Sequence, residues 1–138
     1  MAYAQKADID QLYGADYVAD LLEEGIDADT AATDALGRAS AEIDVHLCVR
    51  YELPLKTMPQ ALVMPCVNIA IYDLALSHGA LTEAIRDRYK DAIDMLKRIA
   101  DGKAGLGPDE PRVTSDPEAS DSGASFSANG RLFSRETL

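Results

Sequence analysis

The chain has 138 residues and a formal net charge of −11, from 24 acidic and 13 basic side chains. This length suits one ordinary domain, and the negative charge argues against tight, sequence-reading DNA binding because phosphates repel an acidic protein. The first residues lack a hydrophobic signal region, and we expect no stretch to reach the ~20 apolar residues of a membrane span. The composition therefore predicts a soluble, cytosolic protein.

Two short helices are predicted at the start of the chain. The first covers residues 8–13 and ends at Gly14, and the second follows Asp16 and ends near Gly25. Aspartate is a favoured N-cap because its side chain accepts a hydrogen bond from the first turn, and glycine readily adopts the left-handed conformation that ends helices.

A longer helix is predicted to begin at Asp27 or Asp29 and to run to Arg50 or Tyr51. Its apolar side chains recur every three or four residues and so lie on one face, namely Ala32, Leu36, Ala39, Ile43 and Leu47. The chain is expected to reverse at residues 53–55, because a residue that precedes proline is disfavoured in the α region.

A central helix is predicted between Pro59 and Ser77, where nearly every side chain is apolar. Proline suits a first helical position. Because Pro65 lacks a backbone donor inside this segment, we allow either a kink there or a helix that begins only after it. Gly79 is expected to end the helix.

The last predicted helix is capped by Thr82 and stops at Gly102. Acidic residues lie early in it and basic residues late, which complements the helix dipole. Its apolar stripe contains Ile85, Tyr89, Ala92, Leu96 and Ile99. Across the whole chain, we expect the core to include Ile43, Leu47, Ile69, Leu74, Ile85 and Leu96.

These elements predict an all-α fold, a small bundle of about five helices with a long, mostly irregular C-terminal arm. Residues 1–102 would form the helical core, 103–124 a flexible linker rich in Gly, Pro, Asp and Ser, and 125–138 a docking arm. Asn129-Gly130 is compatible with a short β-hairpin in the arm.

Apolar and basic side chains return at the end of this polar tail, which indicates that the arm binds a neighbouring copy or another protein. The alternative is an arm that folds back onto its own domain. The candidate partner-binding residues are Phe126, Arg131, Leu132, Phe133, Arg135 and Leu138.

No catalytic, cofactor-binding or metal-binding set stands out. Glu42, His46 and Arg50 share one side of a helix and are interpreted as a solvated ionic stripe. Cys48 and Cys66 lie in apolar helical patterns without zinc-ligand spacing, so we expect buried, reduced thiols.

Two polar residues, Asn68 and Asp73, interrupt the apolar central helix. A carboxylate in such a place can be catalytic, but such residues more often satisfy a backbone group or face a partner helix. We therefore expect no enzyme activity and no cofactor.

The run Ala41-Glu42-Ile43-Asp44-Val45-His46-Leu47-Cys48-Val49-Arg50-Tyr51-Glu52-Leu53-Pro54-Leu55 resembles a signature of the Mu-type head–tail connector proteins of tailed bacteriophages. The similarity continues in order through residues 68–74, 88–92 and 96–103. It closes on Gly130-Arg131-Leu132-Phe133-Ser134-Arg135-Glu136-Thr137-Leu138 and so spans almost the whole chain. Pro65 in the central helix departs from the family pattern.

The resemblance implies a structural virion protein, made in the host cytoplasm and located in the neck at the head–tail interface. About twelve copies would form a ring beneath the portal protein, extend the DNA channel and contact the next neck or tail protein. DNA would pass through this channel without sequence-specific binding, and no membrane would be involved. An acidic protein with no active site and a docking arm suits such an assembly, because weak contacts multiply around a closed ring.

Two alternatives remain open from the sequence. An acidic phage-encoded regulator could bind a host nucleic-acid enzyme as a DNA mimic, but its carboxylates would have to line one face, whereas acidic residues occur in every predicted helix. A small hydrolase could use Asp73 with His46 or His78, which a loss of activity in a single-site variant would support.

Overall fold

The computed structural model describes residues 2–107, and every regular element in this part of the chain is helical. The elements are α1 (Lys6–Tyr13), α2 (Tyr17–Leu21), α3 (Ala28–Leu47), a 3-10 turn at Gln60–Leu62, α4 (Val63–Ser77) and α5 (Glu83–Ala100). The predicted all-α fold with five α-helices is confirmed for the described residues. The C-terminal arm and its predicted hairpin lie outside them.

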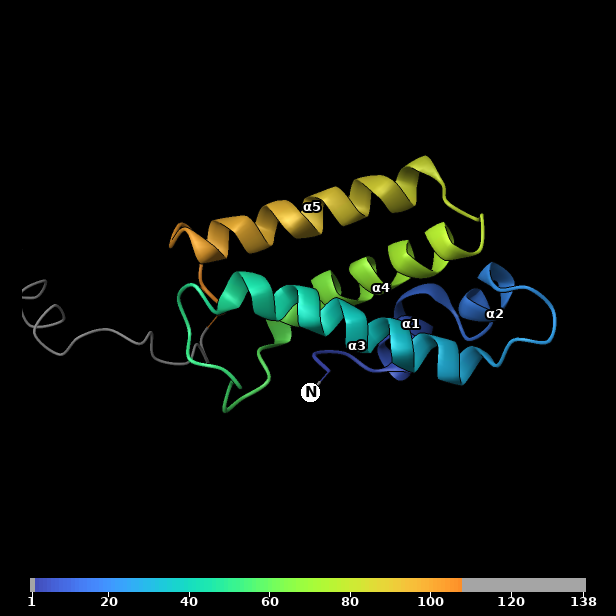
Figure 1. Ribbon diagram of the computed structural model, residues 1–138, viewed down its shortest axis with the longest axis horizontal. Coiled ribbons are helices and arrows are strands. Elements are labelled where there is room, and N and C mark those ends of the chain that lie inside the picture. The colour runs from blue at the N-terminus through green and yellow to red at the C-terminus, as the bar shows by residue number, and fades with distance from the viewer. Residues whose placement is uncertain (1, 108–138) are drawn as a thin grey trace, which may run out of the picture.

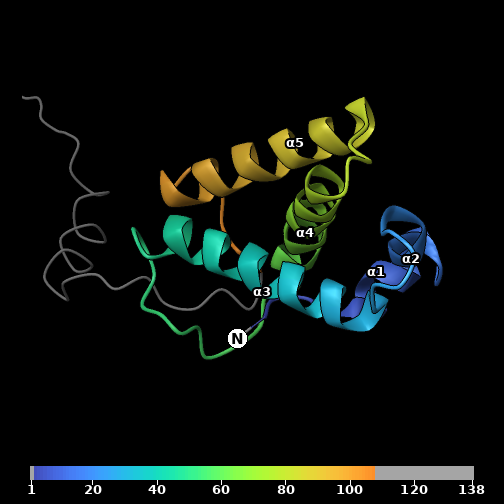
Figure 2. The same cartoon turned by 45° about the vertical axis from the view of Figure 1, so that its right-hand side comes forward.

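Helix α4 is the centre of the fold. It packs on α3 along one side and on α5 along the other, and Figure 1 shows these three helices side by side. In the rotated view of Figure 2, α4 crosses steeply between the other two. Helices α1 and α2 pack against α3 and α4 at one end of this three-helix body.

The buried apolar side chains form one continuous cluster, to which every α-helix contributes. The six side chains that the sequence pattern assigns to the core are each at most 4% exposed, namely Ile43, Leu47, Ile69, Leu74, Ile85 and Leu96. Hydrophobic periodicity therefore identified the buried face of each long helix correctly.

The predicted caps of the two longest helices are present. The Asp27 carboxylate accepts a hydrogen bond from the Thr30 N–H at 3.2 Å, and the Thr82 hydroxyl accepts one from the Ile85 N–H at 3.2 Å. Gly102 follows α5 with a φ of 81°, a conformation that favours glycine.

Three helix boundaries besides the start of α4 differ from the prediction. Helix α1 begins at Lys6, because Gln5 and Asp8 form a capping box in which the Gln5 N–H donates to the Asp8 carboxylate at 2.7 Å. Helix α2 ends at Leu21, before Gly25, and α3 ends at Leu47. The chain tightens after Leu47, whose carbonyl accepts a 3.0 Å hydrogen bond from the N–H of Arg50, three residues later.

The central helix begins four residues later than the predicted start at Pro59, yet before Pro65. Helix α4 begins at Val63, so Pro65 is its third residue. Backbone N–H groups in the first turn have no acceptor within the helix, so a proline there removes no intrahelical hydrogen bond. The preceding 3-10 turn, which follows Pro59, supplies the entry into the helix.

The packed core extends beyond residue 102, where the sequence places the end of the domain. Leu106 is buried in the core cluster, and Ala104 packs against that cluster. Arg50 holds this segment by donating hydrogen bonds to the carbonyls of Ile99 at 3.1 Å and Ala104 at 2.9 Å. The first residues of the predicted linker are therefore part of the folded body.

The segment Gln60–Ser77 is long and apolar enough to cross a membrane by length and composition, which the sequence analysis did not expect. Its mean hydropathy is 1.4 over 18 residues, and half of it is buried inside the protein. A core helix packed between two others requires apolar residues around most of its circumference, so the position of α4 accounts for this composition.

Candidate assembly surfaces

The two polar residues of the central helix join it to neighbouring helices. The Asn68 side-chain oxygen accepts a hydrogen bond from the Tyr13 hydroxyl of α1 at 2.9 Å. Asp73 accepts from Nε of Arg38 in α3 at 3.0 Å and pairs with the same guanidinium at 2.5 Å through Nη2. The interpretation that these residues face partner helices is confirmed. Among the described residues, neither His46 nor His78 donates a hydrogen bond to Asp73.

The predicted ionic stripe of Glu42, His46 and Arg50 does not form. Glu42 accepts a hydrogen bond from the Tyr89 hydroxyl of α5 at 2.9 Å, while Arg50 binds the carbonyls at the end of α5. Helical spacing does place the two residues on one side of α3, but that side turns toward α5 rather than toward solvent. Both side chains therefore connect α3 to α5.

The two cysteines lie in different environments. Cys66 is buried, its Sγ lies 3.5 Å from the Ser40 hydroxyl, and burial raises the pKa of its thiol. Such a thiol is a weak nucleophile because the reactive thiolate is disfavoured. Cys48 is also a free thiol but is exposed, so the expectation of burial is wrong for it. It directly follows α3 and lies outside the buried face of that helix.

Sequence reasoning missed an anchor at the start of the chain. The buried Tyr3 donates its backbone N–H to the Ser40 hydroxyl at 3.0 Å, and its own hydroxyl donates to the Asp44 carboxylate. Burial and the carboxylate together raise the pKa of Tyr3 well above its usual range. Tyr3 and Asp44 are 41 residues apart, so no local pattern could have paired them.

A hollow of about 330 Å³ opens between α1, α4 and α5. Leu12, Tyr13, Met64, Asn68 and Arg88 line it. The Arg88 guanidinium lies 5.3 Å from the centre of the Tyr13 ring, which also stacks on Tyr17 at 4.8 Å. The lining therefore combines the apolar Leu12 and Met64 with polar side chains and one cation.

The C-terminal end of α3 and the turn that follows it carry exposed apolar residues. Val45 is 67% exposed and Val49 is 72% exposed, and the exposed Cys48 lies between them in sequence. We call Val45, Cys48 and Val49 the outer stripe of α3. Contiguous apolar residues on an exposed surface are typical of interaction sites.

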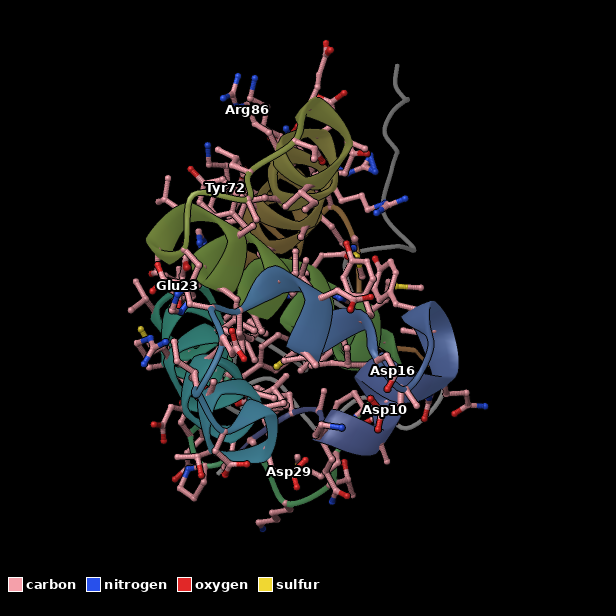
Figure 3. All side chains as sticks on the ribbon, turned by 90° about the vertical axis from the view of Figure 1, so that its right-hand side faces the viewer. Asp10, Asp16, Glu23, Asp29, Tyr72 and Arg86 are labelled. Carbon is pink, nitrogen blue, oxygen red and sulfur yellow. The ribbon has the colours of Figure 1, made fainter. Side chains whose placement is uncertain are left out.

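Charge is distributed unevenly over the fold. Residues 2–37 contain nine acidic side chains and one lysine, a net charge of −8, whereas residues 83–103 contain five acidic and six basic side chains, a net charge of +1. In Figure 3, the acidic residues Asp10, Asp16 and Asp29 lie in the lower half of the molecule, at its right side and base, and Arg86 lies at the top on α5. In the part of the chain that the structure describes, no group of three His, Cys, Asp or Glu residues could hold a metal ion.

The candidate partner-binding residues of the arm cannot be placed on this surface. Phe126, Arg131, Leu132, Phe133, Arg135 and Leu138 all lie outside the described residues. Their role stays a prediction from the sequence.

Comparison with known proteins identifies the family. Residues 3–125 match the family described as bacteriophage Mu, Gp36. The chain is 36% identical over 104 residues to the Mu-like prophage FluMu protein gp36 of Haemophilus influenzae, which covers 75% of this chain and 70% of that protein. It is also 36% identical over 98 residues to gene product J of Escherichia phage Mu, covering 71% of this chain and 67% of the relative. The resemblance to a Mu-type phage family is thereby confirmed, and the chain belongs to the bacteriophage Mu Gp36 family.

Proposed function

We propose that this protein is a head–tail connector of a Mu-like tailed phage. In this role, several copies form a ring beneath the portal, extend the DNA channel and join the capsid to the tail. The family is that of a phage Mu protein, and the sequence signature over residues 41–55 resembles connector proteins. The role requires subunit contacts rather than catalysis.

The observation that carries this proposal is the outer stripe of α3 on an otherwise well-packed helix. The opposite face of α3 buries seven residues in the core, so the exposed Val45 on α3 and the exposed Val49 in the turn after it are not needed for folding. A helix that is apolar on its inner face and again on part of its outer face suits a subunit with neighbours.

The acidic DNA mimic is less well supported by the charge distribution. A mimic needs carboxylates over the surface that replaces the phosphates, whereas this fold combines an acidic end with a last helix of roughly balanced charge. The acidic N-terminal end of one copy and the more basic last helix of another attract each other, which favours assembly of several copies.

The proposal is tested by removing residues 125–138 from the phage-encoded protein. We expect the truncated chain to keep the thermal unfolding transition of the full chain, because the described residues already form a continuous buried cluster among themselves. We also expect heads and tails to accumulate unjoined in electron micrographs. Burial of each large apolar side chain of the arm is worth roughly 1.5 to 3 kcal/mol, so loss of the arm removes substantial contact energy.

A double substitution of Leu132→Ser with Phe133→Ser should reproduce most of this defect. The matched control is Asn129→Ala, which changes only a turn residue and should have a weaker effect. An image reconstruction of the particle neck then locates the protein directly. Tailed, infectious particles from the truncated gene would exclude the docking role of the arm, and a neck without this protein would exclude the connector role.

A further inference from the structure

The boundary between α3 and α5 carries an apolar strip bordered by positive charge. The Tyr89–Glu42 hydrogen bond of 2.9 Å joins the two helices there. Val45 on α3 follows Glu42 by three residues, and Val49, in the turn after α3, follows it by seven. On α5, Arg86 precedes Tyr89 by three residues. Residues at these spacings share one side of a helix. Lys97, eight residues after Tyr89, continues that side of α5.

We call Val45, Val49, Arg86 and Lys97 the α3–α5 seam. All four side chains are exposed. Within the described residues, neither Arg86 nor Lys97 forms an ion pair, so both cations are available to a partner. The seam therefore fits a surface that presents an apolar side chain with carboxylates around it.

The loop between α2 and α3 has this composition. Ile26 is 40% exposed, and the exposed Glu23 and Glu24 precede it. Neither glutamate pairs with a cation within the described residues. The loop turns at Gly25, whose φ is 92°, so that an apolar residue and two carboxylates are presented together at the end of the molecule.

The loop cannot place Ile26 against Val45 and Val49 of its own chain. It precedes the first residue of α3, and Val45 lies 17 residues, about 26 Å, further along the helix at 1.5 Å per residue. We propose that the loop of one copy binds the α3–α5 seam of the next copy, with Ile26 against Val45 and Val49 and the glutamates beside Arg86 and Lys97.

This contact joins two different surfaces, so it is heterologous. Each copy then offers a free loop and a free seam to further copies, and such contacts continue until a ring closes. The biological setting of this inference rests on the proposed connector function, but the contact between copies requires no other protein. Complementary charge at the rim also selects the orientation of binding.

Disulfide cross-linking of the full chain tests the contact. In a Cys48→Ser background, Ile26→Cys and Val49→Cys are introduced together, and the variant is oxidised both as purified protein at high concentration and in assembled particles. We expect a ladder of cross-linked trimers and larger species on a non-reducing gel. Variants with only one of the two introduced cysteines should give no species larger than a dimer, and little of that, because the remaining Cys66 is buried.

A charge exchange provides a second measurement that does not depend on new cysteines. Glu23→Lys with Glu24→Lys should reduce the ladder several-fold, as should Arg86→Glu with Lys97→Glu, and combining all four substitutions should restore it. Arg98→Glu with Lys103→Glu changes two exposed cations off the seam and should leave the ladder unchanged.

The outcomes separate this inference from the connector role. If the image reconstruction shows the protein in the neck but the double-cysteine variant gives no ladder of its own on the gel, the loop-to-seam contact is overturned and the connector role stays intact. Strong dimers of the Val49→Cys variant alone also overturn it, because they show seam-to-seam pairing. A ladder in solution together with particles that lack the protein supports the contact and refutes the connector role.

Discussion

The three-helix body and the N-terminal pair of helices are held in place by different forces. Helices α3, α4 and α5 bury seven, eight and four residues, whereas α1 and α2 bury one each, Ile9 and Val18. The N-terminal segment compensates with long-range hydrogen bonds from Tyr3 to Ser40 and Asp44 and from Tyr13 to Asn68. Apolar packing thus defines the body, and polar contacts fix the segment that lies on it.

This difference predicts unequal local stability. Elements with few buried apolar contacts open locally at lower free energy than the core of a domain. The N-terminal helices should therefore exchange backbone hydrogens faster than α4, although both belong to one fold. The following four predictions test that contrast, beginning with the largest expected effect.

The central helix should be the most sensitive element. Leu74→Ala or Ile69→Ala removes a side chain that is 2% exposed and leaves a cavity, so each should lower the free energy of unfolding by about 2 to 5 kcal/mol. Chemical denaturation measures this loss. The matched control is Leu76→Ala on the same helix, which should change little because Leu76 is 56% exposed. Equal losses at residues 74 and 76 would show that the buried face is assigned wrongly.

The anchor of the N-terminal segment should have an intermediate effect. Ser40→Ala removes the acceptor of the buried Tyr3 N–H, and an unsatisfied buried donor costs about 1 to 3 kcal/mol. The loss should appear mainly as faster hydrogen exchange in α1, measured by mass spectrometry, with α4 and α5 little changed. Ser77→Ala, an exposed serine at the end of α4, is the control. Uniform loss of protection across all helices would contradict the separation of the two regions.

The body was predictable from the sequence because its determinants are local. Spacings of three and four residues placed Ile43, Leu47 and Leu96 on buried faces, and Asp27 and Thr82 marked helix starts through contacts only three residues away. The end of α3 was less predictable. Its side chains would allow another turn, and the tertiary contacts of Arg50 with the end of α5 are invisible to a local pattern.

The surfaces were less predictable than the core, for a related reason. A solvated ionic stripe and a contact with a neighbouring helix have the same sequence spacing, so the roles of Glu42 and Arg50 could not be separated without the position of α5. The exposure of Val45 and Val49 likewise depends on how α3 packs against α4 and α5, which local spacing does not reveal. The arm residues, from Phe126 to Leu138, lie outside the described structure and remain a prediction.

The contact between α3 and α5 should be sensitive to alkaline pH. Burial, followed by the hydrogen bond to Glu42, raises the pKa of Tyr89 from 10.0 to about 12. Its stabilising contribution is fully present below pH 10, the pKa of tyrosine in the unfolded chain, and is lost as the pH rises through about 12. The melting temperature should therefore fall over this range, and it should fall less steeply in Tyr89→Phe.

At neutral pH, Tyr89→Phe loses a hydrogen bond to a carboxylate and should cost about 1 kcal/mol. Tyr3 titrates in the same direction, so some alkaline loss persists in this variant. Tyr72→Phe is a useful control, because Tyr72 stacks on Tyr89 at 4.0 Å and the substitution preserves that stacking. An unchanged alkaline slope in Tyr89→Phe would mean that this hydrogen bond does not control the transition.

The ion pair between Arg38 and Asp73 should contribute least, although its 2.5 Å separation suggests a strong interaction. The Arg38 side chain is 57% exposed, so water screens the charges, and ordering a long side chain costs entropy. Arg38→Ala should therefore lower the free energy of unfolding by at most about 1 kcal/mol, with the loss reduced further at high salt. Denaturation of Arg38→Ala, Asp73→Asn and the double variant forms a cycle that isolates the pairwise energy. A coupling well above that limit would mean that a polar contact stabilises the body as strongly as its apolar packing, and the contrast between the two regions would no longer hold.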